Sequence, residues 1–326
     1  MQEIMFSVAV ITYNQEKYIS QTLDSILNQQ HGYKYEIVIG EDCSTDDTKK
    51  IIEEYVTKYP DIIKPLYNNP NKGLINNYFN VIAHCQGKYI MECAGDDYWL
   101  PGKVKLQIEF MENNPTVGMC YGKAKVYNEN KQKYEKSIIG DFRKNFEEMI
   151  TNENAIPALC VCFKNSLIKK YINEIQPEKK DWLMEDYPMW LYFSNETKIQ
   201  FIDKIMAVYR MLENSASHFT NFNKQLNFEK SVLQIRSFYN NKYQLNYEWE
   251  IDKEYFKMYR KFLLKKYDKN TAKNYRDYYE KIKVKSITNF VIYIFSKSRG
   301  LLNILIIFNK IRKIPKKLVN IIFDFL

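Results

Sequence analysis

The sequence predicts an α/β protein with a doubly wound, mostly parallel sheet flanked by helices, followed by a helical C-terminal extension. From the N-terminus to a helix that begins at Pro101, apolar strand-like runs alternate with segments of helical periodicity four times. Most of these runs end in polar residues. Such alternation favours a parallel sheet with right-handed crossovers. Later apolar runs indicate further strands that make the sheet mixed.

The first strand and helix are expected at residues 6–11 and 16–29. Residues 6–11 form a nearly continuous apolar run rich in β-branched side chains, which is typical of a strand covered on both faces. The next segment has apolar residues at helical spacing, which indicates one buried helix face. Those residues are Ile19, Leu23, Ile26 and Leu27.

A second strand is expected at residues 35–40, and Ser44 is a candidate N-cap for the helix after it. Asp47 stands three residues later, in the place that a capping box gives to Glu, and apolar residues from Ile51 onward form the inner face. The remaining elements of this region are a strand at 62–67, a turn at 71–73, a helix at 74–84 and a strand at 88–93.

The local signals are weaker after the helix that begins at Pro101. Apolar runs indicate further strands at 117–126, 158–163 and 199–209, and residues 221–280 read as helical. We therefore divide the chain into a catalytic domain at 1–220, a helical extension at 221–280 and a basic amphipathic tail at 281–326.

Polar side chains follow three of the predicted strands, at residues 12–14, 41–42 and 96–97. The carboxyl ends of parallel strands meet at one sheet edge, where open α/β sheets bind ligands. Two adjacent carboxylates suit a divalent cation such as Mg²⁺ or Mn²⁺ shared with a phosphate. An ordinary turn is the alternative for Gly95-Asp96-Asp97, and the convergence of three strand ends favours the metal site.

Composition and charge limit the classes of protein. Lys and Arg number 48 against 39 acidic residues, but residues 281–326 contain ten of the bases and one acid, so the first 280 residues are formally neutral. A neutral body argues against a nucleic-acid groove. The six cysteines show no metal spacing, and residues 1–10 show no signal-peptide pattern, so we expect a cytoplasmic protein.

Five stretches together resemble the family 2 glycosyltransferases, which have the GT-A fold, over roughly residues 4–215. Each stretch is a weak signal alone, but their order and approximate spacing are those of the family. They are residues 8–14 (VAVITYN), 41–46 (EDCSTD), 71–73 (NKG), 95–97 (GDD) with Pro101, and 185–186 (ED).

The resemblance implies inverting transfer of a sugar from a nucleotide-sugar donor to a hydroxyl group of an acceptor. It implies that Asp42 accepts a hydrogen bond from a base with an imide N–H, as in UDP or dTDP. Asp186 would be the general base that takes the acceptor proton, with Glu185 supporting it. Donor-binding residues are expected at Thr12, Tyr13, Asn14, Asp42, Lys72, Gly73, Asp96 and Arg210.

The resemblance also implies that Asp97 and Asp96 bind Mn²⁺ or Mg²⁺ against the donor diphosphate. His218 is a further candidate metal ligand, although it could be a surface residue. Many family members have a carboxylate two positions before Asp96, where this chain has Ala94, so we expect phosphate and water to complete the coordination.

The chain lacks the Gln-x-x-Arg-Trp signature of processive family members, which argues for transfer of a single sugar. A nucleotidyltransferase is an alternative enzyme, but residues 12–17 contain no Gly-rich phosphate loop with basic residues. A noncatalytic, membrane-bound sugar-binding or scaffold protein of the same fold is the alternative outside the enzymes. The presence of both Asp97 and Asp186 argues against it.

The basic tail has apolar residues at helical spacing between Ile304 and Ile314, with lysines alongside. Its apolar stretches are too short to span a bilayer, so we expect it to lie on an anionic membrane surface. Packing against the catalytic domain or a second subunit is the alternative. A membrane location at the inner face of the cell membrane would suit a glycan or lipid-linked oligosaccharide acceptor.

Overall fold

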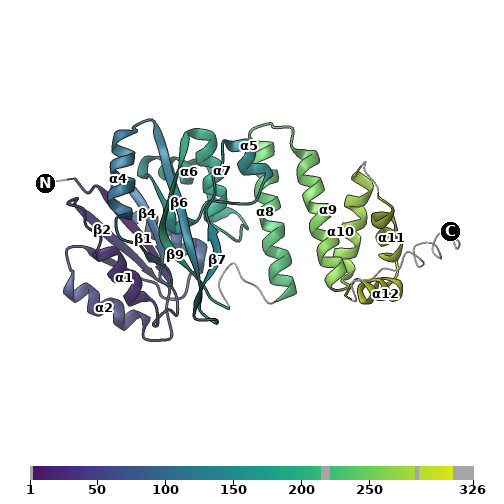
Figure 1. Cartoon of the computed structure of the whole chain (residues 1–326), viewed down its shortest axis with the longest axis horizontal. Helices are drawn as coiled ribbons and strands as arrows, with labels where there is room; N and C mark the ends of the chain where they lie inside the picture. The colour runs from purple at the N-terminus through teal and green to yellow at the C-terminus, as the bar shows by residue number, and fades with distance from the viewer. Residues whose placement is uncertain (1–2, 214–220, 283–285, 311–326) are drawn as a thin grey trace. The chain divides into compact units, whose positions relative to one another are not determined.

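The computed structural model describes residues 3–213, 221–282 and 286–310. The chain divides into two compact units, Met1–Phe219 and Thr220–Leu326 (Figure 1). Each unit has a hydrophobic cluster made of its own residues. The two units are described separately below.

The described part of the first unit contains a nine-stranded mixed sheet with the order β3-β2-β1-β4-β8-β6-β9-β5, and β7 pairs with β6. β3, β2, β1 and β4 are parallel, β8 is antiparallel to both β4 and β6, and β9 is parallel to β6. The strands are β1 Phe6–Thr12, β2 Tyr35–Glu41, β3 Ile63–Tyr67, β4 Tyr89–Ala94, β5 Tyr98–Trp99, β6 Val117–Asn128, β7 Lys133–Ile139, β8 Val161–Lys164 and β9 Lys198–Met211.

This topology confirms the predicted mixed, mostly parallel sheet. Since the direction reverses at β8 and reverses again at β6, β6 and β9 run the same way as the first four strands. The carboxyl ends of six strands therefore lie along one edge of the sheet.

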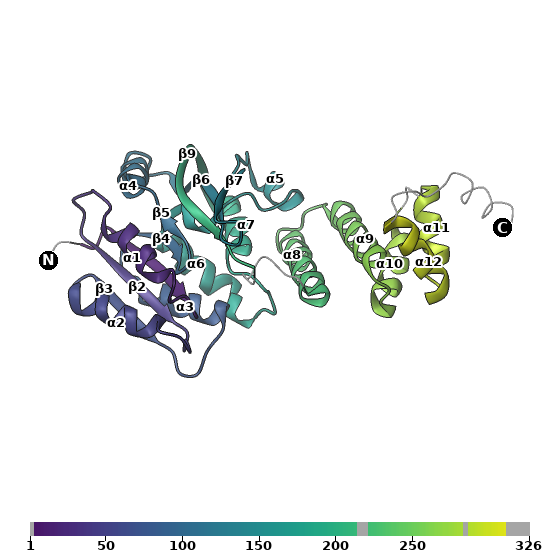
Figure 2. The same cartoon turned by 60° about the horizontal axis from the view of Figure 1, so that its bottom comes forward.

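Helices cover both faces of the sheet (Figure 2). α1, α2 and α4 contribute to the main cluster on one face, while α3, α6 and α7 pack on the other. On that second face the Cα of Gly40 faces α3, and the Phe163 ring contacts α7. The helices are α1 Ile19–Leu27, α2 Thr48–Lys58, α3 Leu74–His84, α4 Lys103–Asn113, α5 Phe146–Thr151, α6 Asn165–Ile175 and α7 Asp186–Glu196.

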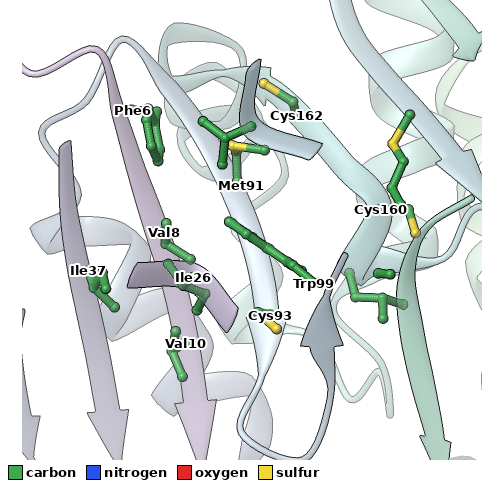
Figure 3. Packing of buried hydrophobic residues seen from close by; sticks show 14 of the residues in the cluster. Phe6, Val8, Val10, Ile26, Ile37, Met91, Cys93, Trp99, Cys160 and Cys162 are labelled. Carbon is green, nitrogen blue, oxygen red and sulfur yellow. The ribbon is translucent and has the colours of Figure 1, made fainter. Parts of the chain in front are cut away.

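The main cluster follows from the alternation of side chains along each strand. Phe6, Val8 and Val10 of β1 point to the same face and are fully buried with Ile37 of β2 (Figure 3). Residues Met91 and Cys93 of β4, and Ile26 of α1, join this layer, as Figure 3 shows. The continuous apolar runs of the sequence are therefore buried central strands, as predicted.

Several local expectations were wrong. Ser44 does not cap α2, which begins at Thr48 after Asp47; Ser44 Oγ instead accepts a hydrogen bond from the backbone of another loop. Residues 158–160 form a short 3-10 helix before β8. β7 was not predicted, because most of its residues are exposed and it carries no apolar alternation.

The second unit is helical in its described part. α8 and α9 pack together, α9 packs with α10, and their inner side chains form a cluster rich in Tyr and Phe. The helices are α8 Phe222–Lys242, α9 Glu248–Lys265, α10 Lys269–Lys281, α11 Ile287–Phe295 and α12 Arg299–Lys310. None of the helices in the described residues is both long and apolar enough to cross a bilayer.

Candidate active site

Three predicted groups meet at the carboxyl edge of the sheet. β1 pairs in parallel with β2 and β4, with Thr12 opposite Glu41 and Ile11 opposite Ala94. Because these strands end side by side, Asp42 and Asp96, which follow them in the chain, lie at the same edge of the sheet. The predicted convergence of these strand ends is confirmed.

Hydrogen bonds join the loops that follow β1 and β2. Asn14 donates its backbone N–H to Ser44 Oγ (3.0 Å), and its side-chain Oδ1 accepts from the backbone N–H of Thr45 (2.8 Å). Asn14, which we expected to bind the donor, therefore holds the two loops together. The neighbouring Tyr13 is 47% exposed, so its ring is open to a ligand.

Asp42 holds the turn that contains Lys72 and Gly73. Its Oδ1 accepts from the backbone N–H of Lys72 (2.8 Å) and from Asn68 Nδ2 (2.9 Å), and its Oδ2 accepts from the backbone N–H of Gly73 (2.9 Å). A carboxylate has about four acceptor positions. One position on Oδ2 therefore remains for another donor, although the residue is 3% exposed.

The space around Gly95 admits no side chain. A Cβ atom at this position would lie 2.4 Å from Gln15 Oε1 and 2.7 Å from Thr12 Oγ1. Both of these oxygens are buried and have no hydrogen-bond partner in the described part of the chain. Glycine therefore lets two unpaired oxygens approach the backbone next to Asp96.

Asp96 and Asp97 have different surroundings although they are adjacent. Asp97 is 4% exposed, and its Oδ1 accepts from the backbone N–H of Arg210 (2.8 Å). Burial raises the pKa of Asp97 well above its ordinary value, and the charge of Asp96 raises it further. Asp96 is half-buried, and burial also raises its pKa. Of the two carboxylates, Asp96 is the more open to a ligand.

Arg210 contacts the Asp96–Asp97 turn and not an open surface. Its Nε donates to the backbone oxygen of Asp96 (2.8 Å), and the residue is 6% exposed. We expected Arg210 among the donor-binding residues. The structure instead surrounds its guanidinium with protein groups.

Glu185 and Asp186 stand at the beginning of α7, where Glu185 is the N-cap residue. Asp186 Oδ1 accepts from the backbone N–H of Tyr187 (2.6 Å), and its Oδ2 accepts from Asn154 Nδ2 (3.1 Å). Burial raises the pKa of Asp186. Burial, and then the charge of Asp186, raise the pKa of Glu185 to about 8. A raised pKa makes a carboxylate a stronger base than a free one, which suits a general base.

A buried carboxyl that the sequence motifs did not predict lies behind this pair. Glu92 of β4 is 5% exposed and accepts a hydrogen bond from the Tyr78 hydroxyl. Burial raises its pKa well above the ordinary value, and the charges of Glu185 and Asp186 act in the same direction. A carboxylate inside the apolar run of residues 88–93 is the signal that could have identified it.

His218 lies outside the described residues. Within residues 3–213, 221–282 and 286–310, His, Cys, Asp and Glu form no group of three or more that could hold a metal ion. A cation at this edge would therefore need oxygen donors of other kinds.

The oxygens beside Asp96 suit a hard divalent cation. Gln15 lies against the Asp96 carboxylate, and the unpaired oxygens of Gln15 and Thr12 flank the same backbone. Mg²⁺ and Mn²⁺ prefer oxygen ligands and accept phosphate and water in the remaining positions. The residues present thus fit Mn²⁺ or Mg²⁺ bound together with a phosphate-bearing ligand.

The profile of glycosyl transferase family 2 matches residues 7–175. An uncharacterized protein of Mycobacterium tuberculosis is 35% identical over 125 residues, which are 38% of this chain and 36% of that protein. The chain therefore spans about a third of the length of this relative.

Other relatives match over more of the chain. The Escherichia coli protein WfgD, named UDP-Glc:alpha-D-GlcNAc-diphosphoundecaprenol beta-1,3-glucosyltransferase, is 26% identical over 239 residues, 72% of this chain and 87% of the relative. The crystal structure of S. aureus TarS 1–349 in complex with UDP-GlcNAc matches with a TM-score of 0.56 at 16% identity, over 91% of this chain and 88% of that chain. At this identity the likeness shows the fold alone.

The family profile covers just over half of the chain. The fold has the mixed sheet, with helices on both faces, that the motifs led us to expect. The chain therefore belongs to glycosyl transferase family 2 and has the GT-A fold.

Proposed function

We propose that this protein is an inverting, metal-dependent glycosyltransferase that moves one sugar from a UDP- or dTDP-sugar to a hydroxyl group of a glycan or lipid-linked glycan. The product would belong to cell-surface polysaccharide. The observation that carries the proposal is the meeting of Thr12, Asp42 and Asp96 at the edge where open α/β sheets bind ligands.

The nucleotide would bind at the ends of β1 and β2. The free acceptor position on Asp42 Oδ2 would take the imide N–H of uracil or thymine, and Thr12 and Tyr13 would line the base and ribose pocket. WfgD carries UDP-Glc in its name, and TarS was solved with UDP-GlcNAc, which supports a uridine nucleotide.

The diphosphate would lie beside the Asp96–Asp97 turn. When bound there, Mn²⁺ or Mg²⁺ would neutralise the negative charge of the leaving diphosphate. Asp96 would hold the cation, and Asp97 could contribute its second oxygen, since Oδ1 already accepts from Arg210. The unpaired oxygens of Thr12 and Gln15 support this position.

Asp186 would take the proton of the acceptor hydroxyl as its oxygen attacks the anomeric carbon of the donor. Asn154 donates to Asp186 Oδ2 and would orient this carboxylate. Glu185, whose pKa is raised to about 8, would be mostly protonated near neutral pH and would not add a second full charge. Attack from the face opposite the diphosphate would invert the anomeric centre.

The second unit would place the enzyme on an anionic membrane, at the cytoplasmic face. α11 and α12 expose large apolar side chains, and the basic residues Lys297 and Arg299 stand where the chain passes from α11 to α12. Exposed apolar area next to basic residues suits an anionic lipid surface. The lipid-linked acceptor in the name of WfgD agrees with this location. The exposed residues are Phe290, Leu301, Ile304 and Ile307.

Titration calorimetry of UDP, dTDP and GDP, with and without Mn²⁺, tests the donor site. We expect one pyrimidine diphosphate to bind in a Mn²⁺-dependent manner, and we expect Asp96→Ala to weaken this binding by at least about tenfold. Asp61→Ala, an exposed carboxylate away from the site, is the control. No diphosphate binding by the wild type under any condition would overturn the proposal.

Cosedimentation with liposomes tests the membrane surface. Ile304→Glu should reduce binding to vesicles that contain phosphatidylglycerol, because it places a charge on an apolar side chain that is 46% exposed. Asn303→Glu adds the same charge at the neighbouring exposed position and is the matched control. Equal binding by the two variants would argue against an apolar contact between α12 and the membrane.

A further inference from the structure

Residues at the carboxyl ends of β6 and β9 make further polar contacts around the Asp96–Asp97 turn. β6 and β9 are parallel, with Tyr127 of β6 opposite Arg210 of β9. Glu129 follows the end of β6 directly, so it lies beside Arg210 although 81 residues separate the two in sequence. None of the motifs that identify the family includes Glu129.

Arg210 contacts both residues of the turn. Its backbone N–H donates to Asp97 Oδ1 (2.8 Å), and its side-chain Nε donates to the backbone oxygen of Asp96 (2.8 Å). One arginine thus holds the Asp97 carboxylate against β9 through its backbone and holds the Asp96 peptide through its side chain. Arg210 hydrogen-bonds the backbone of Asp96, and only its charge acts on the Asp96 carboxylate.

Other residues determine where the guanidinium of Arg210 lies. Its Nη1 donates to Glu129 Oε2 (2.8 Å), and its Nη2 donates to Gln21 Oε1. Three tyrosine rings surround it, with Arg210 Cζ at 4.6 Å, 5.6 Å and 5.7 Å from the ring centroids. These rings belong to Tyr18, Tyr98 and Tyr127.

Glu129 is the charged partner of this buried cation. The Arg210 side chain is 7% exposed and that of Glu129 is 24% exposed. Burial alone would raise the pKa of Glu129, but hydrogen bonds from Arg210 and Gln132 outweigh burial and lower it, so Glu129 is ionised. A buried guanidinium that loses its partner is strongly destabilised, and its side chain would move toward other acceptors.

We propose that Glu129 is a positioning residue for the cation and diphosphate site, acting through Arg210. The ion pair fixes the guanidinium, and the guanidinium fixes the Asp96–Asp97 turn in the orientation that presents the Asp96 carboxylate to the cation. This inference rests on the proposed function of that turn. Residues that orient metal ligands from behind commonly change metal affinity by 10- to 100-fold when they are replaced.

The test uses the full chain and titrates Mn²⁺ into its UDP complex. Electron paramagnetic resonance measures the free Mn²⁺ at each step. Glu129→Gln keeps the shape of the side chain and removes its charge. We expect it to weaken Mn²⁺ binding by about tenfold or more while UDP binding without metal stays unchanged. Glu135→Gln, on the same β6–β7 hairpin but paired with Lys131, is the matched control and should behave like wild type.

A second variant covers the case in which Glu129→Gln does not fold. Gln21→Ala removes the acceptor of Nη2 from an exposed position on α1, and it should weaken Mn²⁺ binding in the same direction by a smaller factor. Arg210→Lys keeps the positive charge but loses the planar guanidinium. We therefore expect this variant to bind Mn²⁺ more weakly than the wild type.

The outcomes separate this inference from the proposed function. Metal-dependent UDP binding by the wild type with unchanged Mn²⁺ affinity in Glu129→Gln would overturn the inference and leave the function standing. If Glu129→Gln weakened UDP binding equally with and without Mn²⁺, Glu129 would have a general structural role, and the inference would also be overturned. Absence of metal-dependent binding of both UDP and dTDP in the wild type would remove the proposed function and this inference together.

Discussion

The carboxyl groups near the sheet edge differ because their neighbours differ. Asp42 accepts from two backbone N–H groups and one side-chain amide, so its carboxylate holds a turn in place. Glu92 accepts from Tyr78 in an interior position, and burial favours its neutral form. Asp186 lies between these cases, since it is partly buried but hydrogen-bonded to Asn154. The same functional group is therefore suited to structural, buried or proton-accepting roles.

The hydrogen bond from Asn154 favours the charged form of Asp186, so Asn154→Ala should raise the pKa of Asp186 further. The base must be deprotonated to act. The acid limb of the pH profile of kcat/KM should therefore move to higher pH, with a loss of up to about tenfold on the acid limb and little loss on the alkaline plateau. Steady-state kinetics with the identified donor would measure this.

Asn152→Ala is the matched control, because Asn152 Nδ2 donates to the backbone oxygen of Glu148 and not to Asp186. Its profile should match that of the wild type. A loss in Asn154→Ala that is the same at every pH would contradict the role of this hydrogen bond.

At the scale of elements, the site depends on loops that are tied to one another after the strands end. The end of β2 is tied to the turn before α3 through Asp42, and the β1 loop is tied to the β2 loop through Asn14. β9 is tied to the turn after β4 through Arg210. Each connection joins elements that the parallel sheet already places side by side.

Asp42→Ala should destabilise the first unit as well as weaken nucleotide binding. The change leaves the backbone N–H groups of Lys72 and Gly73, and the Asn68 amide, without this acceptor. The N–H of Gly73 keeps Asn71 Oδ1 as an acceptor and the Asn68 amide keeps Asn77 Oδ1, so the expected loss in the free energy of unfolding is about 1–3 kcal/mol. Urea unfolding, with exposed Asp61→Ala as the control, measures it. Equal stability of the two variants would refute the role given to Asp42.

At the scale of the whole molecule, the two units have separate hydrophobic clusters. The cluster of the first unit joins strands of the sheet with α1, α2 and α4, while that of the second unit is made of residues between Leu233 and Ile306. Units with separate cores commonly unfold in separate transitions. The residues proposed to bind the nucleotide all belong to the first unit, so the ligand should stabilise that unit.

Differential scanning calorimetry should therefore show two transitions, and UDP with Mn²⁺ should raise the temperature of one of them. Leu263→Ala, in the core of the second unit at 0% exposure, should lower the other transition by removing about 2–5 kcal/mol of stability. A single transition that both changes shift together would contradict independent units and the proposed division near residue 220.

Local patterns predicted the fold well because they report buried faces. The helix at 74–84 and the strands at 6–11 and 35–40 agree with the structure closely, since each carries its own apolar periodicity. The β6–β7 hairpin was missed because Lys133–Ile139 is mostly exposed and pairs through its backbone. The capping role of Ser44 was wrong, because the β1 loop uses its hydroxyl.

The sequence by itself determined the strand and helix alternation, the convergence of polar strand ends and the family, because these depend on residue types at short spacing. The tertiary structure alone decided that Asp97 faces the Arg210 backbone, that Arg210 is enclosed beside Glu129, and that Glu92 is buried behind Asp186. Those contacts join elements that are distant in the chain. No local sequence pattern indicates which partner a polar side chain contacts in the folded protein.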